Sequence, residues 1–384
     1  MKRIAFVNGF VFNSDTESFK KLNIICQDGY IIDITEDKVE NAEVVDMSGK
    51  YLIPGLIDVH THGIAGFDFN VADSEQVLNM RRAYAKRGTT SIMATLASDT
   101  VQRLVNSIFA INANRIDSSY QGANVLGVHL EGRYFNPEKR GAHALDLLAL
   151  PNTEELNTLA QAMMPAPLHI SVAPEMSGAD EFIKTAVSLG ATIGIAHTNA
   201  TYEECLKALS LGATSFTHTF NAMTAVHHRM PGATVCAMTA DKAYAEVISD
   251  GQHLHPAIVK LIYRSKPRDK MVLITDSLAA AGSPDGEYEL AGAKYIVKNG
   301  CCINEFGTIA GSTLTMFDAV LNFMKFCKVP FNKAIKYATV NPANMVGAEL
   351  VGKLEKNYRA EIVVVSDAES PAIESVYVGG RKID

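Results

Sequence analysis

The sequence predicts an α/β protein: a (β/α)8 barrel of the TIM type, with a small β-sandwich domain formed by both chain ends. Three observations support this fold class. Eight segments are continuously apolar and β-branched, helical stretches separate most of them, and short strand-like segments occupy the two ends. Continuous apolar strands are typical of parallel sheets that are covered on both faces, and their alternation with helices indicates a barrel.

The barrel strands are expected at eight apolar segments, which read YLIPGLIDV, TSIMATLAS, ANVLGVHLEG, LHISVAPE, ATIGIAHT, ATSFTHTF, YAEVISDG and MVLITDS. Helices are expected between them over residues 75–87, 100–112, 179–189 and 201–211, and a glycine follows several of these stretches as a helix stop. Residues 288–309 depart from the alternation and predict a β-hairpin insertion. Two helices are expected after it, near residues 314–327 and 332–339.

The chain ends show short strands separated by turn residues. We therefore expect residues 1–50 and 350–384 to form the small β domain together, and residues 51–349 to form the barrel domain.

Composition excludes several classes of function. The 384 residues carry a net charge of −7 and no dense basic tract, so neither nucleic acid nor a membrane surface is expected as a partner. No apolar run approaches the length of a membrane span, and the first residues read as a strand rather than a signal peptide. Six cysteines without CxxC pairs indicate reduced thiols and a cytoplasmic protein.

Polar residues gather at the carboxyl ends of the predicted strands, the face where barrels of this type place their active sites. In chain order they are His60, His62, His129, Glu131, Glu175, His197, His218, Asp250, His253 and Asp276. A single histidine after an apolar strand is more often a core or loop residue than a metal ligand. Because chance would scatter such residues, their shared position favours a metal site.

Imidazole and carboxylate ligands without clustered thiolates suit zinc or a similar divalent ion. Such an ion lowers the pKa of a bound water from about 15.7 to near 7 and so supplies hydroxide at neutral pH. Asp276, at the end of strand eight, is placed to accept and return the proton. The alternative for Asp276 is a helix N-cap.

Nine segments, in order, resemble one family. They read PGLIDVHTHG, HLEG, NPEKRGAH, VAPE, AHTNATYEE, THTFNAMTAVHHRMPG, DGQHLHP, LITDSLAAAG and AGSTLTM. They are similar to the amidohydrolase superfamily and, more narrowly, to the N-acetylglucosamine-6-phosphate deacetylases, with similarity also to the N-acetylgalactosamine-6-phosphate deacetylases. The flanking β segments match as well, so the resemblance covers nearly the whole chain.

The resemblance implies a metal site. Glu131, His197 and His218 match the ligands of the essential ion, while His60 and His62 match a pair that binds a second ion in some members. The number of ions, one or two, therefore stays open. Zinc is the first expectation, with Fe²⁺ or another divalent ion as the alternative.

The resemblance also implies substrate and catalytic residues. Asp276 matches the carboxylate that passes the water proton to the departing amine, and His143 matches a catalytic histidine beside the acetamido group. The positions that hold the sugar phosphate are matched by Asn221, Ala222, Arg229 and His253. In the family the counterpart of Arg229 comes from the neighbouring subunit, which implies a homodimer. The run His227-His228-Arg229 in an otherwise acidic chain also favours an anion over a solvated basic patch.

The residue after HLEG departs from the family pattern. Proline usually follows HLEG, but Arg133 stands here, which frees φ and places a long cation two residues from Glu131. Three interpretations stay open: Arg133 reshapes the pocket, binds an anion, or points to solvent.

The sequence thus predicts hydrolysis of the N-acetyl group of N-acetylglucosamine 6-phosphate. The galactosamine epimer is the first alternative, because a few contacts discriminate one hydroxyl orientation. A cyclic-amide hydrolase is disfavoured, since families of that kind use a lysine on strand four and LHISVAPE has none. A non-catalytic sugar-phosphate-binding protein is disfavoured because every ligand position and Asp276 are present.

Overall fold

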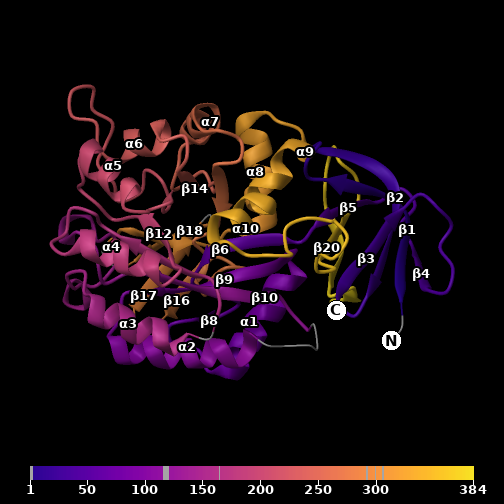
Figure 1. The fold of residues 1–384 in the computed structure, drawn as a ribbon, viewed down its shortest axis with the longest axis horizontal. Coiled ribbons are helices and arrows are strands. Elements are labelled where there is room, and N and C mark those ends of the chain that lie inside the picture. Colours follow the sequence, from indigo (N-terminus) through magenta and orange to yellow (C-terminus); the bar gives the residue numbers. More distant parts are fainter. Residues whose placement is uncertain (1–2, 116–120, 164, 291–292, 299, 305–306) are drawn as a thin grey trace.

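The computed structural model describes residues 3–115, 121–163, 165–290, 293–298, 300–304 and 307–384. A barrel with surrounding helices forms one end of the molecule, and a sheet built from both chain ends forms the other (Figure 1). Within the described residues, no helix has both the length and the apolar character that crossing a membrane requires.

The barrel is an eight-stranded sheet of parallel strands that pair in chain order, which confirms the predicted fold class. Its strands are β6 (Leu56–Thr61), β9 (Thr89–Ala97), β10 (Asn124–Glu131), β11 (Leu168–Val172), β12 (Thr192–Ile195), β13 (Ser215–Phe216), β14 (Tyr244–Ile248) and β15 (Met271–Ile274). At the carboxyl ends of β6 and β15, Asp276 N donates to His60 O (2.9 Å) and His62 N donates to Ser277 O (2.8 Å). These bonds bring the first and last strands together.

Helices alternate with the strands and surround the barrel (Figure 1). They are α1 (Ser74–Lys86), α2 (Val101–Arg115), α3 (Thr153–Ala162), α4 (Ala179–Ser188), α5 (Tyr202–Ser210), α6 (Ala233–Thr239), α7 (Pro256–Ser265), α8 (Met316–Cys327), α9 (Phe331–Ala334) and α10 (Val340–Val346). Capping boxes at Asp73 and Thr201 begin α1 and α5. The helix expected over residues 332–339 is instead α9 and a 3-10 turn (Ile335–Ala338), and α10 begins only after Thr339.

The second sheet joins the two chain ends in the order β22-β21-β20-β5-β1-β2-β3, with β4 beside β1. Its strands are β1 (Ile4–Asn13), β2 (Ser18–Gln27), β3 (Tyr30–Thr35), β4 (Glu43–Asp46), β5 (Tyr51–Pro54), β20 (Ile362–Val365), β21 (Ile373–Val378) and β22 (Arg381–Lys382). Phe6, Ile24, Leu52 and Ile362 contribute to its fully buried core. The division of the chain into domains at residues 51 and 349 stays a prediction.

The first predicted barrel strand, YLIPGLIDV, is in fact two strands of different sheets. β5 pairs with β1 and β20, whereas β6 pairs with β9 in the barrel. Gly55 separates them, and its N–H donates to Glu361 O (2.9 Å). A Cβ at this position would collide with the side chain of Thr90, so the close passage of the chain requires glycine.

The insertion after β15 is larger than the predicted hairpin over residues 288–309. It is a four-stranded antiparallel sheet of β16 (Gly286–Leu290), β17 (Ala293–Lys298), β18 (Cys301–Asn304) and β19 (Ile309–Ser312). Residues 291–292, 299 and 305–306 of the predicted range lie outside the described residues. Ser312 N donates to Asp276 O (2.7 Å), so the insertion borders the carboxyl end of β15. A two-stranded ribbon of β7 (Gly63–Ile64) and β8 (Phe67–Asp68) follows β6.

Candidate active site

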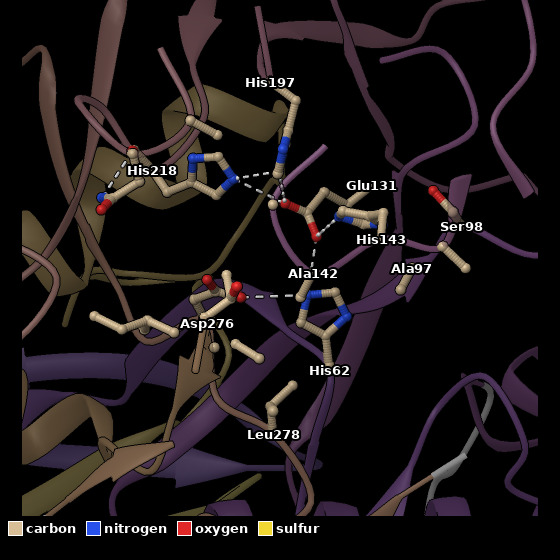
Figure 2. Close-up of a pocket in the computed structure, with 18 of the residues that line it drawn as sticks. His62, Ala97, Ser98, Glu131, Ala142, His143, His197, His218, Asp276 and Leu278 are labelled. Atoms are coloured by element: carbon tan, nitrogen blue, oxygen red, sulfur yellow. Dashed lines mark hydrogen bonds and ion pairs between the residues drawn. The ribbon is translucent and has the colours of Figure 1, made fainter. Parts of the chain in front are cut away.

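A cavity of about 670 Å³ opens at the carboxyl ends of the barrel strands (Figure 2). The predicted site residues that line it are His62, Glu131, His143, His197, His218, Asn221, Ala222, His253 and Asp276. His60 is fully buried beside them, 3.3 Å from Asp276. Arg229 does not line the cavity. It lies on an exposed loop, where its guanidinium donates to His228 Nε2 (2.9 Å).

One oxygen of Glu131 faces a first set of donor atoms, which we name the His60 position. His60 Nε2 and His62 Nε2 lie 3.5 and 3.0 Å from Glu131 Oε2, and each lies 3.3 Å from Asp276 Oδ1. Zinc bonds of about 2.0–2.1 Å in a tetrahedron place neighbouring ligand atoms about 3.3 Å apart. The four atoms therefore fit around one divalent ion.

The other oxygen of Glu131 faces a second set, which we name the His197 position. Glu131 Oε1 lies 3.0 Å from His218 Nε2 and 3.5 Å from His197 Nε2, and the two ring nitrogens are 3.0 Å apart. These three separations are close to those expected between the ligand atoms of one zinc ion, so Glu131, His197 and His218 would hold an ion and leave room for water or substrate. Figure 2 shows Glu131 between these two histidines and His62.

Buried polar atoms support the fit to metal ions. Within the part of the chain that the structure describes, the donor atom His60 Nε2 is buried without a hydrogen-bond partner. A buried polar atom without a partner is unfavourable, and a cation at the His60 position satisfies the nitrogen of His60.

Hydrogen bonds to the far ring nitrogen orient two of the histidines. His197 Nδ1 donates to Lys139 O (2.7 Å), and His60 Nδ1 lies 3.3 Å from Glu246 Oε2. A proton on Nδ1 leaves the lone pair of Nε2 free to face Glu131, which is the usual arrangement of metal-bound imidazole. The sequence reasoning gave Glu246 no role. The sequence did contain a signal for it, because Glu246 is the lone acidic residue of the apolar strand YAEVI.

The backbone turns sharply where three strands end. His197, His218 and Asp276 follow β12, β13 and β15 with φ of 43°, 31° and 50°. Non-glycine residues in this left-handed region cost about 1–3 kcal/mol each and are typical of functional sites. Hydrogen bonds hold this backbone in place, because Asn136 N donates to His197 O (3.0 Å) and Asp276 N donates to His60 O.

The histidines also set the charge of the two carboxylates. Burial alone would raise the pKa of Glu131 and of Asp276, but His60 and the imidazoles around it hold both pKa values well below the ordinary range. Both groups are therefore ionised, the form that binds a cation or takes up a proton. Burial and the nearby His197 lower the pKa of His143 to about 3, so this imidazole is neutral.

His253 borders another side of the cavity. His253 Nδ1 donates to Asp250 Oδ2 (2.6 Å). Burial alone would lower the pKa of His253, but this bond outweighs burial and the pKa is raised. Asn221 lies on the same cavity, with its amide donating to His218 O (3.1 Å), and Ala222 O accepts from Thr198 N (3.0 Å).

Glu175, at the end of β11, ties two segments of the site together. Its carboxylate accepts hydrogen bonds from Asn136 Nδ2 (2.9 Å) and Asn199 N (2.6 Å). Asn136 begins the segment that leads to His143, and Asn199 stands two residues after His197. Glu175 therefore supports the walls of the cavity without lining it, a role that the sequence did not reveal.

Arg133 does not line the cavity. Its guanidinium forms two contacts of 3.1 Å with Glu155 and donates to Asp99 O (2.7 Å), and 14% of its side chain is exposed. Its φ is 67°, and Arg133 N donates to Ser98 Oγ (2.9 Å). These contacts exclude two of the three interpretations: the guanidinium neither binds a substrate anion nor points to solvent. Arg133 instead joins segments at the rim of the cavity.

Comparison with known proteins gives consistent matches. The amidohydrolase family model matches residues 51–383. The chain is 33% identical to the N-acetylglucosamine-6-phosphate deacetylase of Vibrio furnissii, over 90% of this chain and 86% of that protein. It is 32% identical to the N-acetylgalactosamine-6-phosphate deacetylase of Escherichia coli O157:H7, over 88% of this chain and 89% of that protein.

Solved structures agree in fold over the full length. The N-acetylglucosamine-6-phosphate deacetylase of Thermotoga maritima has a TM-score of 0.88 at 27% identity and covers 99% of both chains. A mutant of the Mycobacterium smegmatis enzyme, in complex with N-acetyl-D-glucosamine-6-phosphate, has a TM-score of 0.89 at 27% identity and covers 100% of both. With the cluster of His60, His62, Glu131 and Asp276, the family match indicates a divalent metal ion. The chain belongs to the amidohydrolase family and is a relative of its N-acetylglucosamine-6-phosphate deacetylases.

Proposed function

We propose that this chain hydrolyses the N-acetyl group of N-acetylglucosamine 6-phosphate to give glucosamine 6-phosphate and acetate, in amino-sugar catabolism. The observation that carries the proposal is the position of Asp276, which faces the cavity beside donor atoms spaced for metal ions. Relatives named for this activity match 90% and 91% of the chain at 33% and 31% identity.

Zinc is the ion that we propose, because the donors are imidazole and carboxylate groups. His60, His62, Glu131 and Asp276 would hold one ion, and Glu131, His197 and His218 would hold a second, with a single ion or Fe²⁺ as the alternatives. A bound divalent ion supplies Lewis acidity at the amide carbonyl and hydroxide near neutral pH.

The chain's own groups then move the proton and stabilise charge. The ionised Asp276 takes the proton of the attacking water and delivers it to the departing amine nitrogen. The neutral His143 donates a hydrogen bond to the carbonyl oxygen as negative charge develops there.

The phosphate is assigned to the side of the cavity that holds Asn221, Ala222 and His253. The raised pKa of His253 favours its cationic form, which strengthens a hydrogen bond to an anion. Arg229 lies outside the cavity of its own chain, so we assign it to the cavity of a second copy in a homodimer. A cytoplasmic location, expected from the cysteines, belongs to the same proposal.

Deacetylation of N-acetylgalactosamine 6-phosphate is the second candidate. A relative of that name is 32% identical to this chain over 88% of its length. The relative named as a glucosamine-type enzyme has a similar identity, 33% over 90% of this chain. The two sugars differ in the orientation of one hydroxyl, which a few contacts discriminate.

Acetate release from both sugars by zinc-loaded protein tests the proposal. We expect a higher kcat/KM for N-acetylglucosamine 6-phosphate, and we expect Asp276→Asn to lose roughly 10²–10⁴-fold in kcat, since it can no longer accept the proton. The opposite ratio of kcat/KM would favour the galactosamine assignment. Zinc-bound wild-type protein that releases no acetate from either sugar would contradict deacetylation.

A further inference from the structure

Glu246, on β14, is a fully buried carboxylate inside the barrel. It contacts His60 and His218, two of the residues that carry the donor atoms. A buried carboxylate is unfavourable unless hydrogen bonds or opposite charges compensate it. Because every other residue of β14 is apolar and buried, a carboxylate here needs an explanation beyond packing.

One oxygen of Glu246 contacts one residue from each of the two sets of donors, His60 and His218. Glu246 Oε2 lies 3.3 Å from His60 Nδ1 and accepts a hydrogen bond from the backbone N–H of His218 (3.2 Å). His60 uses its other nitrogen, Nε2, toward Asp276 Oδ1 (3.3 Å) and Glu131 Oε2 (3.5 Å). A single imidazole therefore connects the buried carboxylate to the His60 position.

The contact gives the Nδ1 proton of His60 an acceptor. His60 Nε2 also faces carboxylate oxygens, but it would bind an ion only through its lone pair, and the single proton of a neutral His60 then lies on Nδ1, where Glu246 Oε2 accepts it. The same contact limits rotation of the ring, and a carboxylate partner raises the basicity of a metal-bound imidazole.

The other oxygen of Glu246 makes a looser contact. Glu246 Oε1 and His169 Nε2 are 3.6 Å apart, and within the described part of the chain neither atom has a hydrogen-bond partner. His169 Nδ1 lies 2.8 Å from Thr192 Oγ1, and neither residue lines the cavity. His169 is therefore a neighbour of Glu246 that does not reach the donor atoms, and it provides a matched control.

We propose that Glu246 is a positioning residue. It holds the His60 ring in place with the proton on Nδ1, so that Nε2 can bind an ion at the His60 position. The inference rests on the metal-dependent function proposed above. It assigns Glu246 to retention of the ion that His60, His62, Glu131 and Asp276 hold.

Zinc binding by the full-length protein provides the test. The metal-free protein is titrated with zinc in competition with a chromophoric chelator, and the bound metal is counted by elemental analysis. We expect wild type to bind two ions per chain and Glu246→Gln to bind one of them roughly 10–100-fold more weakly. The control His169→Gln should keep both affinities within about threefold of wild type. Unchanged affinities in folded Glu246→Gln, or a single ion in wild type, would overturn the proposal.

A second background separates positioning from a general structural role. In His60→Gln, the further change Glu246→Gln should cause no additional loss of zinc, because the residue it acts through is gone. A loss of equal size in both backgrounds would show that Glu246 acts on the whole barrel and would refute the proposal. Acetate release is not the readout, so failure of the proposed deacetylation is recognised separately from failure of this inference.

Discussion

The Nε2 atoms of His197 and His218 lie 3.0 Å apart, with Glu131 Oε1 3.0 Å from the nitrogen of His218. The ring of His197 already donates its Nδ1 proton to Lys139 O, so its Nε2 presents a lone pair to this space. Two nitrogens and one carboxylate oxygen at such separations suit a cation better than a set of hydrogen bonds. We therefore expect metal binding to depend most on Glu131, which faces both sets of donor atoms.

Glu131→Gln should abolish tight zinc binding at both positions. The amide loses the negative charge and presents an N–H₂ group to one set of histidines, so we expect affinity to fall more than the roughly 100-fold that loss of an outer contact causes. Elemental analysis after dialysis measures the bound zinc. His253→Asn, which alters the proposed phosphate side alone, should keep wild-type zinc while KM rises. Two tightly held ions in Glu131→Gln would contradict a bridging role.

Glu175→Ala should lower kcat by about 100-fold, because a displacement of about 1 Å in a catalytic group has effects of that size. Its carboxylate joins the segments that carry His143 and His197, although it does not line the cavity. Steady-state acetate release measures kcat and KM, with Glu203→Gln on the exposed start of α5 as the control. Wild-type kcat in Glu175→Ala would show that these segments hold their positions without it.

Arg133→Pro should destabilise the protein even though proline is usual here in the family. The φ of 67° is inaccessible to proline, which is restricted to about −65°, and the ring removes the N–H that donates to Ser98 Oγ. Arg133→Gly accepts the backbone conformation and loses the side-chain contacts to Glu155, Asp99 and Leu147. Thermal unfolding should therefore give a lower Tm for the proline variant than for the glycine variant. The reverse order would mean that the segment changes conformation to accept proline.

Lys266 should make stability rise with pH in the alkaline range. It is buried with Nζ donating to Ala240 O (2.6 Å), and burial lowers its pKa from 10.5 to about 8. Between pH 8 and 10.5 the unfolded chain binds more protons at this residue than the folded chain, so the free energy of unfolding increases with pH. The slope from one such group is at most about 1.4 kcal/mol per pH unit.

Urea unfolding of wild type and Lys266→Met at pH 7.5 and 10 measures this contribution. The variant has no group that titrates at this position, so wild type should gain stability relative to it between the two pH values. Comparing the two proteins cancels the tyrosines and cysteines, which titrate in both. A constant difference in the free energy of unfolding would show that Lys266 does not titrate in this window.

The barrel and most of the site could be predicted because their signals are local in the sequence. Continuous apolar strands identify the parallel sheet, and polar residues directly after them mark the face of the cavity. The break at Gly55 could not be predicted, since it depends on how closely Thr90 approaches in the folded chain. The partners of Glu175 and Glu246 lie far away in the sequence, so a local pattern such as YAEVI can mark the acidic residue but not the contacts that it makes.

The conformation at Arg133 shows a second limit. The sequence identified a departure from the family, but the side chain's direction is decided by Glu155 and Asp99, which lie on other segments. An arginine that is exposed to solvent and an arginine that pairs with other segments look the same in a sequence. They differ only in the position of their partners in the folded chain.

β5 pairs with β1 on one side and with β20 on the other, so the sheet at the chain ends needs strands from both extremes of the sequence. During synthesis the barrel strands and every cavity residue leave the ribosome before β20 does. Until then β5 presents an unpaired edge, and such edges promote aggregation of nascent chains. Arrival of the last strands covers that edge, so a chain that terminates before β20 would carry a complete set of cavity residues and still be prone to aggregate.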